Sequence, residues 1–229
     1  MSHVLVLRPK PGADETIARA RNLGLDATAA PIFSVRPLDW TAPNREDFDA
    51  LMVTSANALR HAGRELSLFA SLPCYAVGEA TARAAREVGF EVTAGTSNGE
   101  ALLELIAADG RKRILHLCGR DHRSAERPGL SITRRVVYAA DPVSTFSSEA
   151  SEALNGGAVT LIHSPRAGAL FGQLVDTARM QRNALRIAAI SDAAAAAAGS
   201  GWRDVAVARA PSDEALLECA AKLCKTVGA

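Results

Sequence analysis

Small and hydroxyl-bearing residues end several apolar runs that are typical of buried strands. Each of the following stands at or just after the end of such a run: Thr54, Ser55, Gly78, Thr81, Gly119 and Ser164. Where a parallel strand passes into a helix, the first N–H groups of the helix are free to bind a carboxylate or phosphate. Ser and Thr also cap helices without any ligand. Their recurrence in both halves of the chain favours an anion-binding role for the set.

Two histidines also lie in strand-like runs. His116 stands inside one run and is interpreted as a satisfied core residue, whereas His163 ends a run and could be either a core residue or a functional one. The charged segment 120–127 follows Gly119. It is either a solvated face or, through Arg120 or Arg123, a clamp for a carboxylate.

Tyr138 offers a hydroxyl that can donate or accept a proton, although a packing role explains a tyrosine equally well. Nucleophile elbows, phosphate-binding P-loops, HExxH helices and a dinucleotide-binding glycine fingerprint are all missing from the sequence. The cysteines form no CxxC pair, and Cys74 and Cys118 lie in apolar runs typical of buried thiols. We therefore expect neither a metal nor a cofactor.

The composition excludes some classes of function. Lys and Arg number 26 against 25 Asp and Glu, so a broad basic face for nucleic acid is not expected. The longest apolar stretch, around 193–198, is too short for a membrane span, and no signal-peptide pattern opens the chain. We expect a cytoplasmic protein without membrane or nucleic-acid partners. A monomer is expected, since no long apolar stripe suggests a partner surface.

Short apolar runs alternate with helix patterns along most of the chain. Helices are predicted for 13–23, 81–88 and 101–108, the last opened by a capping box at Ser97. Strands are predicted for Val4–Leu7, Leu51–Ser55, Cys74–Gly78, Arg113–Gly119 and Ala158–Ser164. This alternation predicts an α/β protein with parallel sheets.

The two halves of the chain repeat one another. FDALMVTSANAL matches GAVTLIHSPRAGAL, CYAVGEATARAAREVG matches IAAISDAAAAAAGSG, and SNGEALLELIAA matches SDEALLECAAKL, in the same order. Segments 26–38 and 131–143 fit neither half and are interpreted as crossovers. The sequence thus predicts one lobe from 1–37 plus 144–229, a second from 38–143, and a ligand cleft between them.

The ordered motifs make the chain similar to the uroporphyrinogen-III synthase family over nearly its whole length. They are VLVLRP, FDALMVTSANAL, AVGEATARAAREVG, SNGEALLELI, ILHLCG, VVY and the series HSPRAGALF, IAAISDA, SDEALLE. The resemblance implies two flavodoxin-like lobes joined by a two-stranded crossover. It also implies a cofactor-independent lyase that closes hydroxymethylbilane, a linear tetrapyrrole rich in carboxylates, to uroporphyrinogen III with inversion of the terminal ring.

The resemblance further assigns roles to residues. Tyr138 matches the cleft tyrosine of the family and is expected to assist departure of the substrate hydroxyl. Thr54, Ser55, Gly78, Thr81, Gly119 and Ser164 match its ligand-facing turns, and Arg8, Ser97 and Arg120 complete the predicted substrate-binding set.

The chain departs from the family pattern in two places. Ser191-Asp192-Ala193-Ala194 replaces a glycine and threonines in the second half, and Leu7-Arg8-Pro9 replaces the common TRP. The first departure leaves room for an alternative, a non-catalytic two-lobed binder of a small anionic ligand. A regulatory protein built on paired lobes is a second alternative, but neither Thr54-Ser55 nor His163-Ser164 offers a phosphoacceptor aspartate at a strand end.

Overall fold

The computed structural model of the protein describes residues 2–95, 98–122 and 124–225. Its contacts divide the chain into two compact units, one made of Met1–Ser34 with Pro142–Ala229 and the other of Val35–Asp141. We call them unit 1 and unit 2. Among the described residues, no helix has the length and apolar character needed to cross a membrane.

Unit 1 is built on a parallel sheet of five strands in the order β11-β10-β9-β1-β2. Numbered along the unit, this is the 2-1-3-4-5 order of doubly wound folds. The described elements are β1 (His3–Val6), α1 (Gly12–Asn22), β2 (Asp26–Ala29), α5 (Ser148–Asn155), β9 (Val159–Ile162), α6 (Pro165–Thr177), β10 (Arg186–Ala189), α7 (Asp192–Ala198), β11 (Asp204–Val207) and α8 (Asp213–Lys225).

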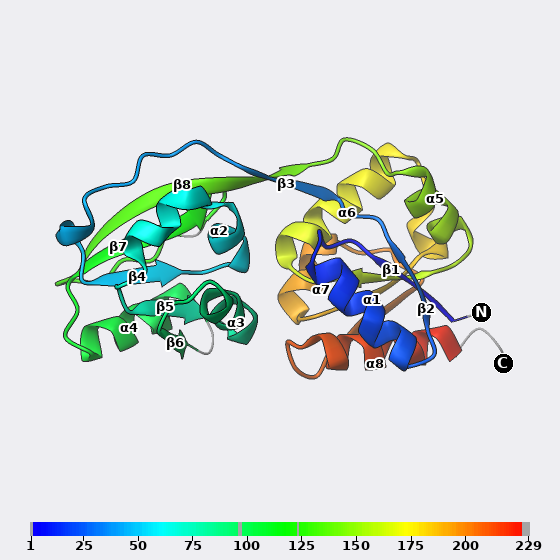
Figure 1. Cartoon of the computed structure of the whole chain (residues 1–229). Coiled ribbons are helices and arrows are strands. Elements are labelled where there is room, and N and C mark those ends of the chain that lie inside the picture. Colours follow the sequence, from blue (N-terminus) through cyan, green and yellow to red (C-terminus); the bar gives the residue numbers. More distant parts are fainter. Residues whose placement is uncertain (1, 96–97, 123, 226–229) are drawn as a thin grey trace. The chain divides into compact units, whose positions relative to one another are not determined.

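Helices cover both faces of this sheet (Figure 1). Along β1, Val4 and Val6 pack against α1 and α8, whereas Leu5 and Leu7 pack against α5, α6 and α7. The alternation follows from the two-residue period of a strand. Helices α1 and α8 lie side by side on their face of the sheet.

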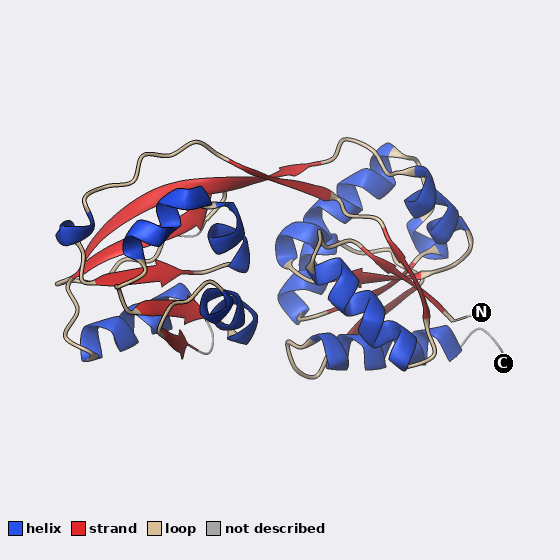
Figure 2. Ribbon diagram, in the orientation of Figure 1, coloured by secondary structure: helices blue, strands red, loops and turns tan. Residues whose placement is uncertain are grey.

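Unit 2 contains most of a six-stranded sheet in the order β3-β8-β7-β4-β5-β6. Its elements are β3 (Phe33–Pro37), β4 (Ala50–Val53), α2 (Ala56–His61), β5 (Cys74–Val77), α3 (Glu79–Glu87), β6 (Val92–Gly95), α4 (Gly99–Ala108), β7 (Arg113–Gly119) and β8 (Ser131–Pro142). Helices α2 and α3 pack on one face and α4 on the other (Figure 2).

Strands β3 and β8 are the segments through which the chain passes from one unit to the other. Leu38 N donates to Val137 O at 2.9 Å, and Val143 N donates to Ile32 O at 3.1 Å. Because the partner number falls as the residue number rises, this pair of strands is antiparallel. The other pairings of the sheet are parallel.

The predicted α/β class with parallel sheets is confirmed. The spatial order β6-β5-β4-β7-β8 of unit 2 repeats the order β11-β10-β9-β1-β2 of unit 1. Strands β4, β5 and β6 therefore correspond to β9, β10 and β11, in agreement with the matched sequence segments. One prediction is wrong, because the segment 26–38 is not a single crossover. Strand β2 belongs to the unit 1 sheet, and the chain breaks at Pro31, which cannot donate to a ladder.

Candidate functional site

The carboxyl ends of the parallel strands carry most of the predicted site residues. In unit 2 the order of strands reverses between β4 and β7, and in unit 1 between β9 and β1. Ligands of open α/β sheets bind beyond the strand ends at such points. The residues at these ends are described first for unit 2 and then for unit 1.

Tyr138 lies at a bulge of β8, opposite Gly119 at the end of β7. Cys118 pairs with Val136, but the next residue, Gly119, pairs with Tyr138, so Val137 is an extra residue on β8. Bulges of this kind redirect a side chain. Arg120 N donates to Tyr138 O at 2.9 Å and fixes this arrangement just past the end of β7.

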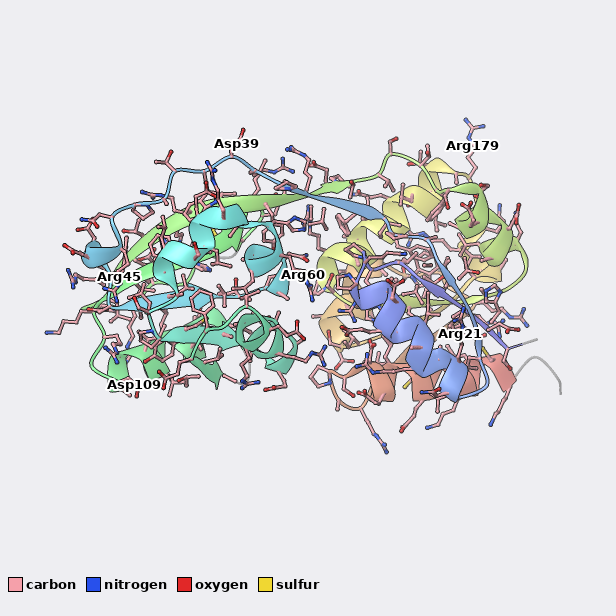
Figure 3. The ribbon with its side chains drawn as sticks, in the orientation of Figure 1. Arg21, Asp39, Arg45, Arg60, Asp109 and Arg179 are labelled. Atoms are coloured by element: carbon pink, nitrogen blue, oxygen red, sulfur yellow. The ribbon has the colours of Figure 1, made fainter. Side chains whose placement is uncertain are left out.

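Because Gly119 has no side chain, the Tyr138 ring can occupy the space beside it. A Cβ at Gly119 would lie 2.5 Å from Tyr138 Cζ and 2.8 Å from its hydroxyl oxygen. The ring of His61, at the end of α2, has its centroid 6.3 Å from that of Tyr138. Burial lowers the pKa of His61, and the charge of Arg60 (Figure 3) adds a smaller effect in the same direction. The imidazole beside Tyr138 is therefore neutral.

Thr54 follows β4, and its hydroxyl approaches a buried histidine. Thr54 Oγ1 lies 3.4 Å from His116 Nε2, a long contact. His116 is 2% exposed, which confirms its predicted core position. Burial, followed by the charges of His122 and Arg134, lowers the pKa of His116 to about 4. The imidazole is therefore neutral at physiological pH.

Two further turns of unit 2 begin helices. Ser55 caps α2, its hydroxyl accepting from Asn57 N at 3.2 Å. Gly78 precedes α3 with φ of 75°, a left-handed conformation that glycine adopts without strain. Thr81, one turn into α3, is only 6% exposed.

Ser97 lies outside the described residues. The predicted capping box is corrected, because Asn98 is the residue that caps α4, its Oδ1 accepting from Ala101 N at 2.9 Å.

Arg120 is engaged in an exposed ion network. Its Nη2 lies 2.5 Å from Asp141 Oδ1, and Arg36 Nε lies 2.7 Å from the other oxygen of the same carboxylate. A clamp on a substrate carboxylate would have to compete with Asp141. Arg123, the other candidate for this clamp, lies outside the described residues.

In unit 1, Ser164 caps α6, since its hydroxyl accepts from Ala167 N at 3.1 Å. Arg8 follows β1, and its guanidinium lies over Gly12, where a Cβ would come within 2.6 Å of its Cζ. At the departure from the family pattern, Ser191 caps α7 with an extended φ of −160°. The left-handed glycine of the corresponding turn in unit 2, Gly78, thus has no counterpart here.

Arg8 belongs to a buried network that sequence reasoning missed. At the centre is Asp213, the first residue of α8, whose side chain is 9% exposed. Its donors are Thr16 Oγ1 at 2.7 Å, Arg19 Nη1 at 2.9 Å, His163 Nε2 at 3.0 Å and Arg8 Nη1 at 3.4 Å. Burial by itself would raise the pKa of Asp213. The hydrogen bonds from His163 and Thr16, with the charge of Arg8, outweigh it and hold that pKa well below its ordinary value.

A groove of about 780 Å³ lies at the opposite, amino edge of the unit 2 sheet, and none of the predicted site residues lines it. Three arginines and three carboxylates line it together, among them Arg45 and Asp109 (Figure 3). The balanced charge and the position away from the strand carboxyl ends both make it a poor site for a polyanion.

The family model described as uroporphyrinogen-III synthase HemD matches residues 14–218. No curated protein gives a significant match. A methionine-substituted variant of uroporphyrinogen III synthase from the extreme thermophile Thermus thermophilus is 17% identical, with a TM-score of 0.54 over 99% of this chain and 100% of that chain. The wild-type enzyme of the same organism, in a second crystal form, is 17% identical with a TM-score of 0.45 over 100% of both chains. At this identity the likeness to the variant concerns the fold.

Proposed function

The chain belongs to the uroporphyrinogen-III synthase family, and we propose that it closes hydroxymethylbilane to uroporphyrinogen III with Tyr138 as the proton donor. The observation that supports this role is the fit between Tyr138 and Gly119 at the β7–β8 bulge. There the phenol lies beside Gly119, the last residue of the parallel strand β7.

The proposed reaction begins with loss of the hydroxyl of the hydroxymethyl group. The C–O bond breaks, Tyr138 O–H gives its proton to the departing oxygen, and water leaves. The pyrrole ring then loses its N–H proton, which restores the Tyr138 hydroxyl. The remaining azafulvene is an electrophile that needs no further activation. Attack by the substituted carbon of the terminal ring gives a spiro intermediate, whose rearrangement inverts that ring. The protein therefore contributes mainly orientation, together with modest acid assistance.

Orientation requires that the carboxylates of the substrate be held. The N-termini of α2, α3 and α6, which follow Ser55, Gly78 and Ser164, present backbone N–H groups at strand carboxyl ends. Such groups bind carboxylates without the desolvation of a buried cation. We assign the predicted turns of both units to this task, with Thr54 and Arg8 beside them.

The experiment is to incubate the protein with freshly generated hydroxymethylbilane, oxidise the products and separate the uroporphyrin isomers. Spontaneous closure gives type I, so type III reports catalysis. Tyr138→Phe should lower the rate of type III formation by roughly 100-fold, the low end of the usual contribution of a general acid.

The matched control is Tyr75→Phe, because Tyr75 is the other tyrosine of the sequence. Its hydroxyl donates to Asp109 at 2.7 Å, near the amino edge of the same sheet. Tyr75→Phe should keep the type III rate. Type I alone from folded wild-type protein would refute the proposal and favour the non-catalytic binder. That alternative has no support in the comparisons, which point to synthases.

A further inference from the structure

His163 carries a buried nitrogen that has no partner among the described residues. The residue directly follows β9, and its side chain is 9% exposed. Nε2 lies 3.0 Å from Asp213 Oδ1. Nδ1 is buried and meets no hydrogen-bond donor or acceptor in the part of the chain that the structure describes. A buried polar atom left in this state destabilises the folded protein, so its retention calls for an explanation.

The partner of Nε2 fixes where the imidazole carries its proton. Asp213 is ionised and is therefore an acceptor, with Thr16 and Arg19 donating to its other oxygen. Nε2 is then the N–H donor to Asp213. In the tautomer that carries this proton alone, Nδ1 offers a lone pair and pairs only with a donor such as an N–H group.

The position of His163 connects it with the ligand-binding edge of unit 1. Strands β9 and β1 are neighbours at the reversal of strand order, and Arg8 follows β1. The Arg8 side chain is 34% exposed and shares Asp213 Oδ1 with the imidazole at the long distance of 3.4 Å. A guanidinium held this weakly can turn to a substrate carboxylate.

Among its described residues, unit 2 has no equivalent of the hydrogen-bonded pair His163 and Asp213. By strand order and sequence match, His163 corresponds to Thr54 and Asp213 to Gly99. A Cβ at Gly99 would lie 4.0 Å from Thr54 Cγ2, so the two positions are neighbours in unit 2 as well. The same place in the fold thus holds a hydrogen-bonded His–Asp pair in one unit and small residues in the other.

We propose that His163 is a substrate-binding residue whose Nδ1 accepts a hydrogen bond from a pyrrole N–H of the linear tetrapyrrole, with Asp213 as its positioning residue. This inference rests on the proposed function, since that substrate combines neutral N–H donors with carboxylates. In the proposed complex Arg8 turns from Asp213 to a carboxylate of the substrate. The imidazole of His163 accepts a hydrogen bond from the N–H of the pyrrole ring that bears this carboxylate.

Two substitutions separate binding from structure. His163→Asn keeps an amide atom near the place of Nδ1 but loses the reach to Asp213, whereas His163→Gln keeps a donor to Asp213 and loses the acceptor. His163→Gln should be about as stable as wild type but raise KM for hydroxymethylbilane about 5- to 10-fold, the worth of one neutral hydrogen bond. His163→Asn should keep KM within about 3-fold and unfold at lower urea concentration. The reverse pattern, with Gln normal in KM and Asn impaired, would show that His163 only anchors α8.

A second measurement does not depend on turnover. Side-chain ¹⁵N NMR of the wild-type protein should show His163 protonated at Nε2 alone, and reduced uroporphyrinogen I, which carries the same N–H groups, should shift the Nδ1 signal. The signal should not shift in a titration with a tricarboxylate that lacks N–H groups. If Nδ1 is unmoved by uroporphyrinogen I while wild type still makes type III, this inference fails and the proposed function stands. If wild type makes only type I, the proposed function fails on its own.

Discussion

His116 illustrates how a single side chain in the unit 2 core links stability to pH. Its ring is 2% exposed, Thr54 and His122 are its polar neighbours, and Arg134 adds a nearby positive charge. Among the described residues no carboxylate raises its pKa, so protonation would bury a charge without compensation. The folded state therefore favours the neutral imidazole.

The pH dependence of unfolding should report this group. Its pKa is about 4 in the folded chain and about 6.5 when unfolded, so between these values the unfolded state binds more protons. The contribution of His116 is complete above about pH 6.5 and is lost as pH falls towards 4, at most about 3 kcal/mol. Urea titrations from pH 7 to 4 should show this loss. His116→Leu should flatten the curve there, whereas an unchanged curve in His116→Leu would contradict the assignment.

At the scale of elements, α6 and α7 approach unusually closely because α6 contains two buried glycines on the contact face. A Cβ at Gly168 would lie 2.5 Å from Ala194 O and 3.0 Å from Ala198 N, and one at Gly172 would lie 2.7 Å from Ala198 O. The obstacle is backbone, which cannot turn aside as a long side chain can. The alanine-rich sequence of α7 fits the same close approach.

Gly168→Ala should therefore destabilise the protein by about 1–3 kcal/mol, the usual range for overpacking. The sign is informative, because in a free helix the same change would be favourable by up to about 1 kcal/mol. Urea denaturation measures this change in the free energy of unfolding. Gln173→Ala, at an exposed position of the same helix, should stay within about 0.5 kcal/mol of wild type. A stabilised Gly168→Ala variant would mean that α6 and α7 do not pack as described.

At the scale of the whole molecule, each unit contains a sheet with helices on both faces and its own hydrophobic clusters. Unit 2 is one continuous segment, and the chain leaves and re-enters unit 1 at adjacent points, since Val143 N bonds to Ile32 O at 3.1 Å. Each unit therefore satisfies the conditions for folding alone.

The fragment 35–141 should fold cooperatively by itself, and so should a chain in which 1–34 is joined to 142–229 by a short Gly-Ser linker. Circular dichroism with urea titration would show one sigmoidal transition for each. Neither fragment should form type III product, because the proposed proton donor lies in unit 2 and His163 in unit 1. A fragment that unfolds without cooperativity would show that its sheet depends on the other unit.

The sequence allows the α/β class and the helices α1, α3 and α4 to be predicted, because most strands are short apolar runs and these helices carry caps or glycine stops. It could not distinguish Ser97 from Asn98 as the cap of α4, since both residue types cap well. Asp213 and His163 are 50 residues apart, and nothing local signals their contact. The bulge that pairs Gly119 with Tyr138 is likewise set by packing between strands and not by a local motif.

The placement of β1 in the middle of the unit 1 sheet has a consequence for synthesis on the ribosome. Strands β1 and β2 emerge first, but β1 pairs with β9, which ends at Ile162. By then every described strand of unit 2 has been made, so that unit can fold while its host sheet is still incomplete. Until β9 arrives, one edge of β1 stays unpaired, and a nascent chain that stalls in this interval exposes that edge to its neighbours.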